Sequence, residues 1–132
     1  MLKRLSVIAS AVVILFAVAG CRSAVPVAQV TDEPFFAASK NSDLNQVTQK
    51  ILEVGKRRGF SMKVIAPGHI EAFYAKHEVR AVMDIKYTTE HFSITYKDST
   101  NLKYNSASNT ISRHYNTWVK NLKADISNIY PL

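Results

Sequence analysis

The sequence contains a single cysteine, Cys21, among its 132 residues. One cysteine excludes an intrachain disulfide and every zinc motif built on several cysteines, so the core alone must stabilise the fold. Glycine and proline are also scarce, at four each, which excludes collagen-like and low-complexity chains. The sequence has no G-x-S-x-G nucleophile elbow. Its 47% content of hydrophobic residues suits one small globular domain.

The N-terminus carries the longest apolar run, from Leu5 to Gly20, directly behind Lys3 and Arg4. A short apolar run behind basic residues is typical of a secretory signal peptide, and it is shorter than the roughly 20 residues that a membrane-spanning helix needs. We therefore expect residues 1–20 to be removed from the mature protein.

The residues at the end of this run, Val18-Ala19-Gly20-Cys21, resemble the lipobox of bacterial lipoproteins. The resemblance implies that the mature protein begins at a lipidated Cys21 and that its acyl chains hold it on a membrane. Arg22 replaces the Asp that typically retains lipoproteins at the inner membrane of enteric bacteria, so we expect the periplasmic face of the outer membrane. The alternative for Cys21 is an incidental thiol behind an uncleaved anchor.

Basic side chains outnumber acidic ones. Without Lys3 and Arg4, 15 Lys and Arg residues remain against 10 Asp and Glu residues, which gives a net charge of +5. Such an excess favours anionic lipids or acidic envelope polymers, or it simply keeps the domain soluble. The expected envelope location argues against nucleic acid as a partner.

The segment from Arg22 to Lys40 contains Pro26 and Pro34 and has no periodic apolar stripe, so we interpret residues 21–40 as the lipidated cysteine and a flexible tether. Fully extended, this tether would reach roughly 60 Å. Phe35 and Phe36 are expected either to dock its end on the domain or to rest at the membrane interface. The globular domain is then residues 41–132.

Two strands and their register are predicted between Ala81 and Lys97, because apolar and polar residues alternate on both sides of a turn at Thr88–His91. Pairing Ile85 with Ile94 puts every large apolar side chain on one face, whereas a slip by one residue would turn one set to water. The same parity pairs Ile85 with Ile70 in the preceding strand. The register also places Met83 opposite Tyr96 and Ala72, and Tyr87 opposite Phe92.

The remaining elements follow from periodicity and from capping residues. We expect a helix from Asp43 to Arg58, capped by Asn41 or Ser42, and a helix from about Ile111 to Asn128. Two further strands are predicted at 60–65, with Phe60, Met62 and Val64 inward, and at 69–76. The fold class is therefore an α+β two-layer sandwich, in which a four-stranded antiparallel meander carries two helices on one face.

Four motifs in the second half of the chain are similar to those of a family of small bacterial, proteobacterial-type lipoproteins for which we know no activity. They are I-x-Y (Ile85, Tyr87), S-I-x-Y (Ser93–Tyr96), S-x-N-L-x-Y (Ser99–Tyr104) and I-x-x-x-Y-N-x-W-V-x-x-L (Ile111–Leu122). The resemblance implies a shared fold and an envelope location only. Val47 and Gly55 depart from the aromatic residue and alanine that the family pattern leads us to expect.

The chain offers little support for metal or cofactor chemistry. The four histidines, His69, His77, His91 and His114, fall on different elements or at opposite ends of the predicted sheet. We therefore expect no metal site and no cofactor.

A candidate binding surface lies on the outer face of the predicted sheet. The register places Glu71 opposite Asp84, with Thr95 beyond and lysines around them, an arrangement that suits either a solvated ion-paired surface or paired carboxylates for acid/base work. Phe73, Val82 and the stem of Lys97 form a small apolar strip beside them. The proposed surface comprises Glu71, Phe73, Val82, Asp84, Thr95 and Lys97.

Tyr115, Asn116 and Trp118 are a second candidate, because such residues can recognise a sugar or a peptide. Alternatively they are structural, with Tyr115 and Trp118 on the buried stripe and Asn116 tying down the Ser99–Asn109 loop. The preferred hypothesis is a non-enzymatic, lipid-anchored binding or scaffold module for an envelope protein or polymer. The alternative is a small envelope hydrolase that uses Glu71 and Asp84.

Overall fold

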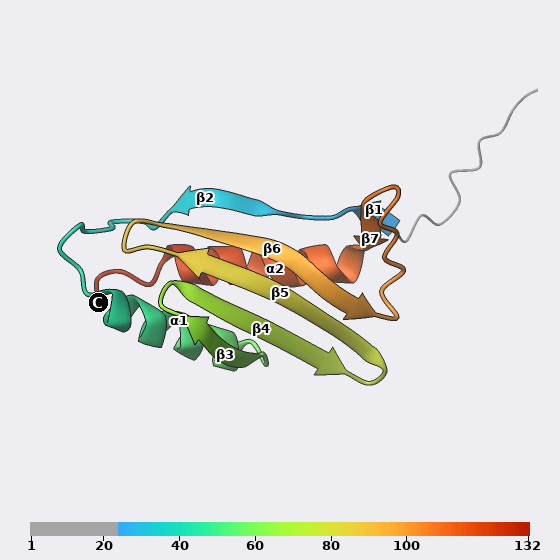
Figure 1. Ribbon diagram of the computed structural model, residues 1–132, viewed down its shortest axis with the longest axis horizontal. Coiled ribbons are helices and arrows are strands. Elements are labelled where there is room, and N and C mark those ends of the chain that lie inside the picture. The colour runs from blue at the N-terminus through green and yellow to red at the C-terminus, as the bar shows by residue number, and fades with distance from the viewer. Residues whose placement is uncertain (1–23) are drawn as a thin grey trace, which may run out of the picture.

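The two strands predicted between Ala81 and Lys97 lie inside a five-stranded antiparallel sheet in the computed structural model, which describes residues 24–132 (Figure 1). The strand order is β2-β6-β5-β4-β3, and the sheet is formed by β2 (Val30–Pro34), β3 (Ser61–Ala66), β4 (His69–Lys76), β5 (Val79–Tyr87) and β6 (His91–Thr100). A small second sheet pairs β1 (Ala24–Pro26) with β7 (Thr110–Ser112). The helices are α1 (Leu44–Arg57) and α2 (Arg113–Ser127).

The register predicted from side-chain parity is confirmed. Ile85 is opposite Ile94 on one side and Ile70 on the other, and Met83 is opposite Tyr96 and Ala72. A bulge between Val82 and Met83, which the alternation did not indicate, shifts the pairing of β5 with β6. The α+β class is thus confirmed, but the count of four strands is wrong.

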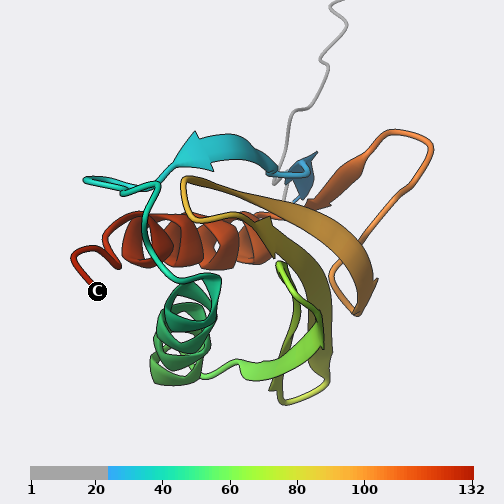
Figure 2. The ribbon, with the colours of Figure 1, turned by 60° about the vertical axis from the view of Figure 1, so that its left-hand side comes forward.

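Both helices cover the inner face of the sheet, as predicted (Figure 2). Ile70, Met83, Ile85 and Ile94 on this face are fully buried, and they share one core with the apolar stripes of the helices. Burial of such side chains removes apolar surface from water and supplies most of the favourable free energy of folding. The outer face carries no helix (Figure 2).

The first predicted helix is present as α1, and its apolar residues Val47, Ile51 and Val54 are buried. Its N-cap is Asp43, whose Oδ1 accepts a hydrogen bond from the backbone nitrogen of Asn45 at 2.8 Å, so the predicted caps at Asn41 or Ser42 are wrong. Asp is as good a cap as either, which explains the displacement by one residue.

The second helix begins two residues later than predicted. Ile111 is buried not as a helical residue but in β7, where it is opposite Val25. Ser112 is the N-cap, and its hydroxyl accepts a hydrogen bond from the backbone nitrogen of His114. The spacing of Ile111 to Tyr115 imitates one helical turn, and this coincidence hid the short strand.

The interpretation of Arg22–Lys40 as a tether is wrong for its described part. Val30–Pro34 forms β2, the fifth strand and one edge of the sheet, with a bulge between Val30 and Glu33. Only Val30 of this strand is buried, so no alternation reveals it, and a proline is tolerated at an edge. Phe35 docks in the core at 3% exposure, whereas Phe36 is 72% exposed.

The strand β3 forms the other edge. Met62 packs against the core, but Val64 is 47% exposed, so its predicted inward position is wrong. The pairing of β3 with β4 shifts between Val64 and Ala66, which marks a bulge at the end of β3. An edge strand receives cover on fewer sides, which explains the exposure of Val64.

The predicted signal peptide and Cys21 lie outside the described residues. Within residues 24–132, none of the helices has the length and apolar character that a membrane span requires.

Candidate functional site

The outer face of the sheet carries the residues that the sequence nominated. Glu71 is opposite Asp84, Asp84 is opposite Thr95, and Phe73 is opposite Val82, as the register predicted. All of these side chains are half-buried, and Lys97 lies at the bulge beside them. The predicted grouping of these positions is therefore present in the fold.

The two carboxylates of this face do not act as a pair. Lys97 Nζ lies 2.5 Å from Glu71 Oε2, and His69 Nε2 lies 2.7 Å from Asp84 Oδ1. The hydrogen bond and the charge of Glu71 raise the pKa of Lys97. Because each carboxylate has its own basic partner on another strand of the sheet, the arrangement favours an ion-paired surface over a proton-sharing pair.

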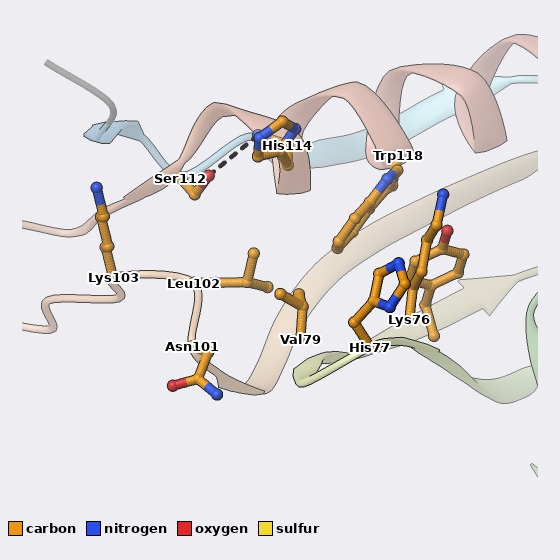
Figure 3. A pocket seen from close by; sticks show the side chains of 10 residues that line it. Lys76, His77, Val79, Asn101, Leu102, Lys103, Ser112, His114 and Trp118 are labelled. Carbon is orange, nitrogen blue, oxygen red and sulfur yellow. Dashed lines mark hydrogen bonds between the residues drawn. The ribbon is translucent and has the colours of Figure 1, made fainter. Parts of the chain in front are cut away.

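A pocket that the sequence did not nominate lies at the end of the sheet where β4 and β6 finish (Figure 3). We call it the end pocket; its volume is about 510 Å³. Its walls come from the β4–β5 turn, the loop after β6 and the start of α2. It is lined by Tyr74, Lys76, His77, Val79, Asn101, Leu102, Lys103, Ser112, His114 and Trp118.

The floor of the end pocket is apolar and aromatic. Leu102 is only 2% exposed, and Val79 and Trp118 pack partly against the core. The Trp118 ring lies against Tyr74, with 4.4 Å between the ring centroids, and Tyr74 in turn contacts Phe60. This chain of rings fixes the position of Trp118, so the floor is rigid and preformed.

The rim of the end pocket is basic. Lys76, His77 and Trp118 lie together on one side and Lys103 on the opposite side, with His114 at the start of α2 (Figure 3). None of the ten lining residues is an Asp or a Glu. The first turn of α2 adds the positive end of a helix dipole. The pocket therefore combines an apolar floor with a basic rim whose lining contains no acidic side chain.

The pocket also corrects the placement of the histidines. The sequence put all four apart, but His77 in the β4–β5 turn and His114 in the first turn of α2 line the same pocket. Antiparallel strands bring alternate turns to one end of a sheet, and the chain reversal after β6 returns α2 to that end. Among residues 24–132, no three His, Cys, Asp or Glu side chains gather as a metal site would require.

The three residues of the second candidate, Tyr115, Asn116 and Trp118, have different roles. Tyr115 is fully buried, and burial raises the pKa of its hydroxyl. Asn116 does not tie down the 99–109 loop as predicted; it accepts a hydrogen bond from Ala28 N at 2.9 Å and donates one to Pro26 O at 2.8 Å. Trp118 lines the end pocket.

The loop after β6 is held by other contacts. Leu102 anchors it in the core, and Ser112 N donates a hydrogen bond to Leu102 O at 2.8 Å. Tyr104 remains 39% exposed and stacks on Tyr96. A usable sequence signal for the end pocket did exist: basic residues follow β4, follow β6 and begin α2, and these three positions meet at one end of the sheet.

Searches of protein-family models, curated proteins and solved structures find no match to this chain. The resemblance to small bacterial lipoproteins therefore stays a prediction, and the argument for function depends on the site itself.

Proposed function

We propose that this chain is a lipid-anchored protein of the bacterial cell envelope and a non-enzymatic binding module, whose end pocket takes a ligand with an anionic and an apolar part. The observation that carries the proposal is the lining of the pocket: an apolar floor beneath a basic rim, without an acidic side chain. The lipobox-like residues before and at Cys21 support the anchor. Arg22 supports the periplasmic face of the outer membrane.

Binding is favoured over catalysis by the state of Ser112, the serine in the upper wall of the pocket. The Ser112 hydroxyl accepts from the backbone nitrogen of His114, at 3.4 Å, and so serves as the cap of α2 (Figure 3). Within the described residues it makes no hydrogen bond to an imidazole that would activate it. The pocket also lacks a carboxylate to orient such a base.

The anchor is tested in growing cells by metabolic labelling with a palmitate analogue that carries an alkyne. The wild-type protein should take up the label and fractionate with membranes, and Cys21→Ser should do neither. Equal labelling of the two proteins would contradict the anchor.

The pocket is tested with a matched pair of dyes, anilinonaphthalene sulfonate and the same ring system without the sulfonate, N-phenylnaphthylamine. The protein is residues 21–132 with Cys21→Ser, after a check that it unfolds cooperatively. Trp118 is the only tryptophan of the chain, so energy transfer from it reports occupancy of the end pocket. The sulfonate should bind about fivefold or more tightly than the neutral dye, because it pairs with the rim.

Two lysine variants complete this test. Lys76→Gln removes one charge from the rim, and Lys86→Gln removes one from the exposed outer face. Only the first should reduce the preference for the sulfonate. Equal affinity for both dyes in the wild-type protein, or equal effects of both variants, would contradict the proposed function.

A further inference from the structure

The end pocket lies at the same end of the molecule as the start of the described chain. Figure 1 shows β1, β7, the finish of β6 and the β4–β5 turn at one end of the molecule, with the C-terminus at the opposite end. The pairing of β1 with β7 supports this proximity, because Ala24 is opposite Ser112 and Ser112 lines the pocket. The place where the chain enters the domain is thus a wall of the pocket.

The distance from the anchor to this wall is short. Cys21 precedes Ala24 by three residues, and three Cα–Cα steps span at most about 11 Å. This reach is far below the roughly 60 Å expected when the whole of Arg22–Lys40 is taken as a tether. If Cys21 carries acyl chains, this short reach holds the end pocket beside the polar headgroup layer of the bilayer.

The chemistry of the pocket matches what lies in that layer. Lysine is a common ligand of phosphate, and a basic rim near a membrane attracts anionic lipids. Below the rim, Val79, Leu102 and Trp118 offer apolar contact to the glycerol and to the first methylenes of an acyl chain. Tryptophan is also enriched at the membrane–water interface. A zwitterionic headgroup suits the rim less, because its positively charged group would lie near the basic side chains of the rim.

We infer that the end pocket binds an anionic phospholipid of the membrane that holds Cys21, with the phosphate at the basic rim and the upper acyl chain on the apolar floor. This inference depends on the proposed function and names the ligand of its pocket. It also orients the molecule: the end of the sheet with β1 and β7 faces the bilayer, and the outer face of the sheet stands at its side.

The first experiment uses the non-acylated residues 21–132 with anilinonaphthalene sulfonate bound. Dihexanoyl phosphatidylglycerol, kept below its micelle concentration, should displace the dye at concentrations at least about fivefold lower than dihexanoyl phosphatidylcholine or inorganic phosphate. Displacement of equal strength by inorganic phosphate would overturn the inference in favour of a free anion. Dye binding without displacement by either lipid would overturn the inference and leave the proposed function intact.

The second experiment uses the lipidated protein in nanodiscs. Bromine atoms near the glycerol end of the acyl chains are placed on phosphatidylglycerol in one sample and on an equal fraction of phosphatidylcholine in another. We expect about twofold or stronger quenching of Trp118 by the brominated anionic lipid, a difference that Lys76→Gln reduces and Lys86→Gln preserves. Equal quenching by both lipids would overturn the inference. A protein that carries no lipid would instead contradict the proposed function.

Discussion

The outer face of the sheet and the end pocket contain the same kinds of side chain, but their charges are arranged differently. On the outer face, Glu71 is paired with Lys97 and Asp84 with His69. In the end pocket, Lys76, Lys103 and two histidines surround an apolar floor, and no acidic residue lines it. On the outer face each acid already has a basic partner, whereas the lining of the pocket contains no acid that would compete with an anionic ligand.

This difference teaches that a cluster of charged residues in a sequence is not by itself a site. The alternation of side chains along the strands correctly predicted that the charged residues of the outer face lie together. In the structure they pair with one another across strands, and such pairs stabilise a sheet by modest amounts. The end pocket combines residues from three separate segments, and its basic rim is what a partner of opposite charge can complement.

The largest expected effect is a loss of stability when a side chain on the buried inner face of the sheet, which supports both regions, is truncated. Ile85→Ala should lower the free energy of unfolding by about 2–5 kcal/mol, because Ile85 is fully buried beside Ile70 and Ile94 and its truncation leaves a cavity. Chemical denaturation measures this loss. A loss below about 1 kcal/mol would mean that the inner face is not packed as described.

The next largest effect is expected from a substitution that gives the end pocket an acidic side chain, as the outer face has. Lys76→Glu introduces an acidic side chain into the rim and reverses one charge, so the affinity for anilinonaphthalene sulfonate should fall about tenfold. The midpoint of thermal unfolding should change little, because Lys76 is exposed. Lys86→Glu on the outer face is the matched control and should leave the affinity unchanged. An equal loss in both variants would mean that the dye senses net charge only.

A smaller effect is expected when the outer face loses both acids. Glu71→Gln combined with Asp84→Asn removes two ion pairs on a partly exposed surface, so the protein should remain folded with a modestly lower thermal midpoint. The affinity of the end pocket for the sulfonate should stay the same. Loss of dye binding in this double variant would show that the two regions are coupled.

The smallest effect is expected at an ion pair that lies away from both regions. Arg58 contacts Asp125 through two hydrogen bonds between α1 and α2 and lowers the pKa of that carboxyl. Since the folded-state pKa is depressed, the stabilisation is complete above the unfolded value of about 3.9 and is lost as the pH falls through the folded value.

The check on this pair is a comparison of thermal midpoints between wild type and Asp125→Asn as the pH is lowered. The wild type should be slightly more stable at neutral pH, and the difference should vanish in acid. A difference that grows as the pH falls would have the wrong sign for this pair.

Much of the fold could be predicted because the central strands obey a simple rule. Alternation between Ala81 and Lys97 dictated the register, and the burial of Ile85 and Ile94 enforces it. The strands β2 and β7 escaped prediction for different reasons. Only Val30 is buried in β2, and Ile111 of β7 coincides with a helical spacing. Where one buried side chain holds a strand, periodicity carries no signal.

The candidate site divides in the same way. Positions on one strand pair, such as Glu71 and Asp84, could be placed together from parity alone. The end pocket depends on where the loop after β6 turns and on where α2 begins, since Leu102 and Ser112 belong to its lining. The start of α2 was misplaced by two residues and the basic residues of the three segments were not considered together, so the meeting of His77, His114 and Trp118 was missed.

The most direct test of the end pocket as the binding site is an amide chemical-shift map of residues 21–132, with Cys21→Ser, during titration with anilinonaphthalene sulfonate. The account predicts that the largest shifts fall in three segments that line the pocket: 76–79, 101–103 and 112–118. Shifts concentrated instead at Glu71, Asp84 and Thr95, with the pocket segments unmoved, would contradict it.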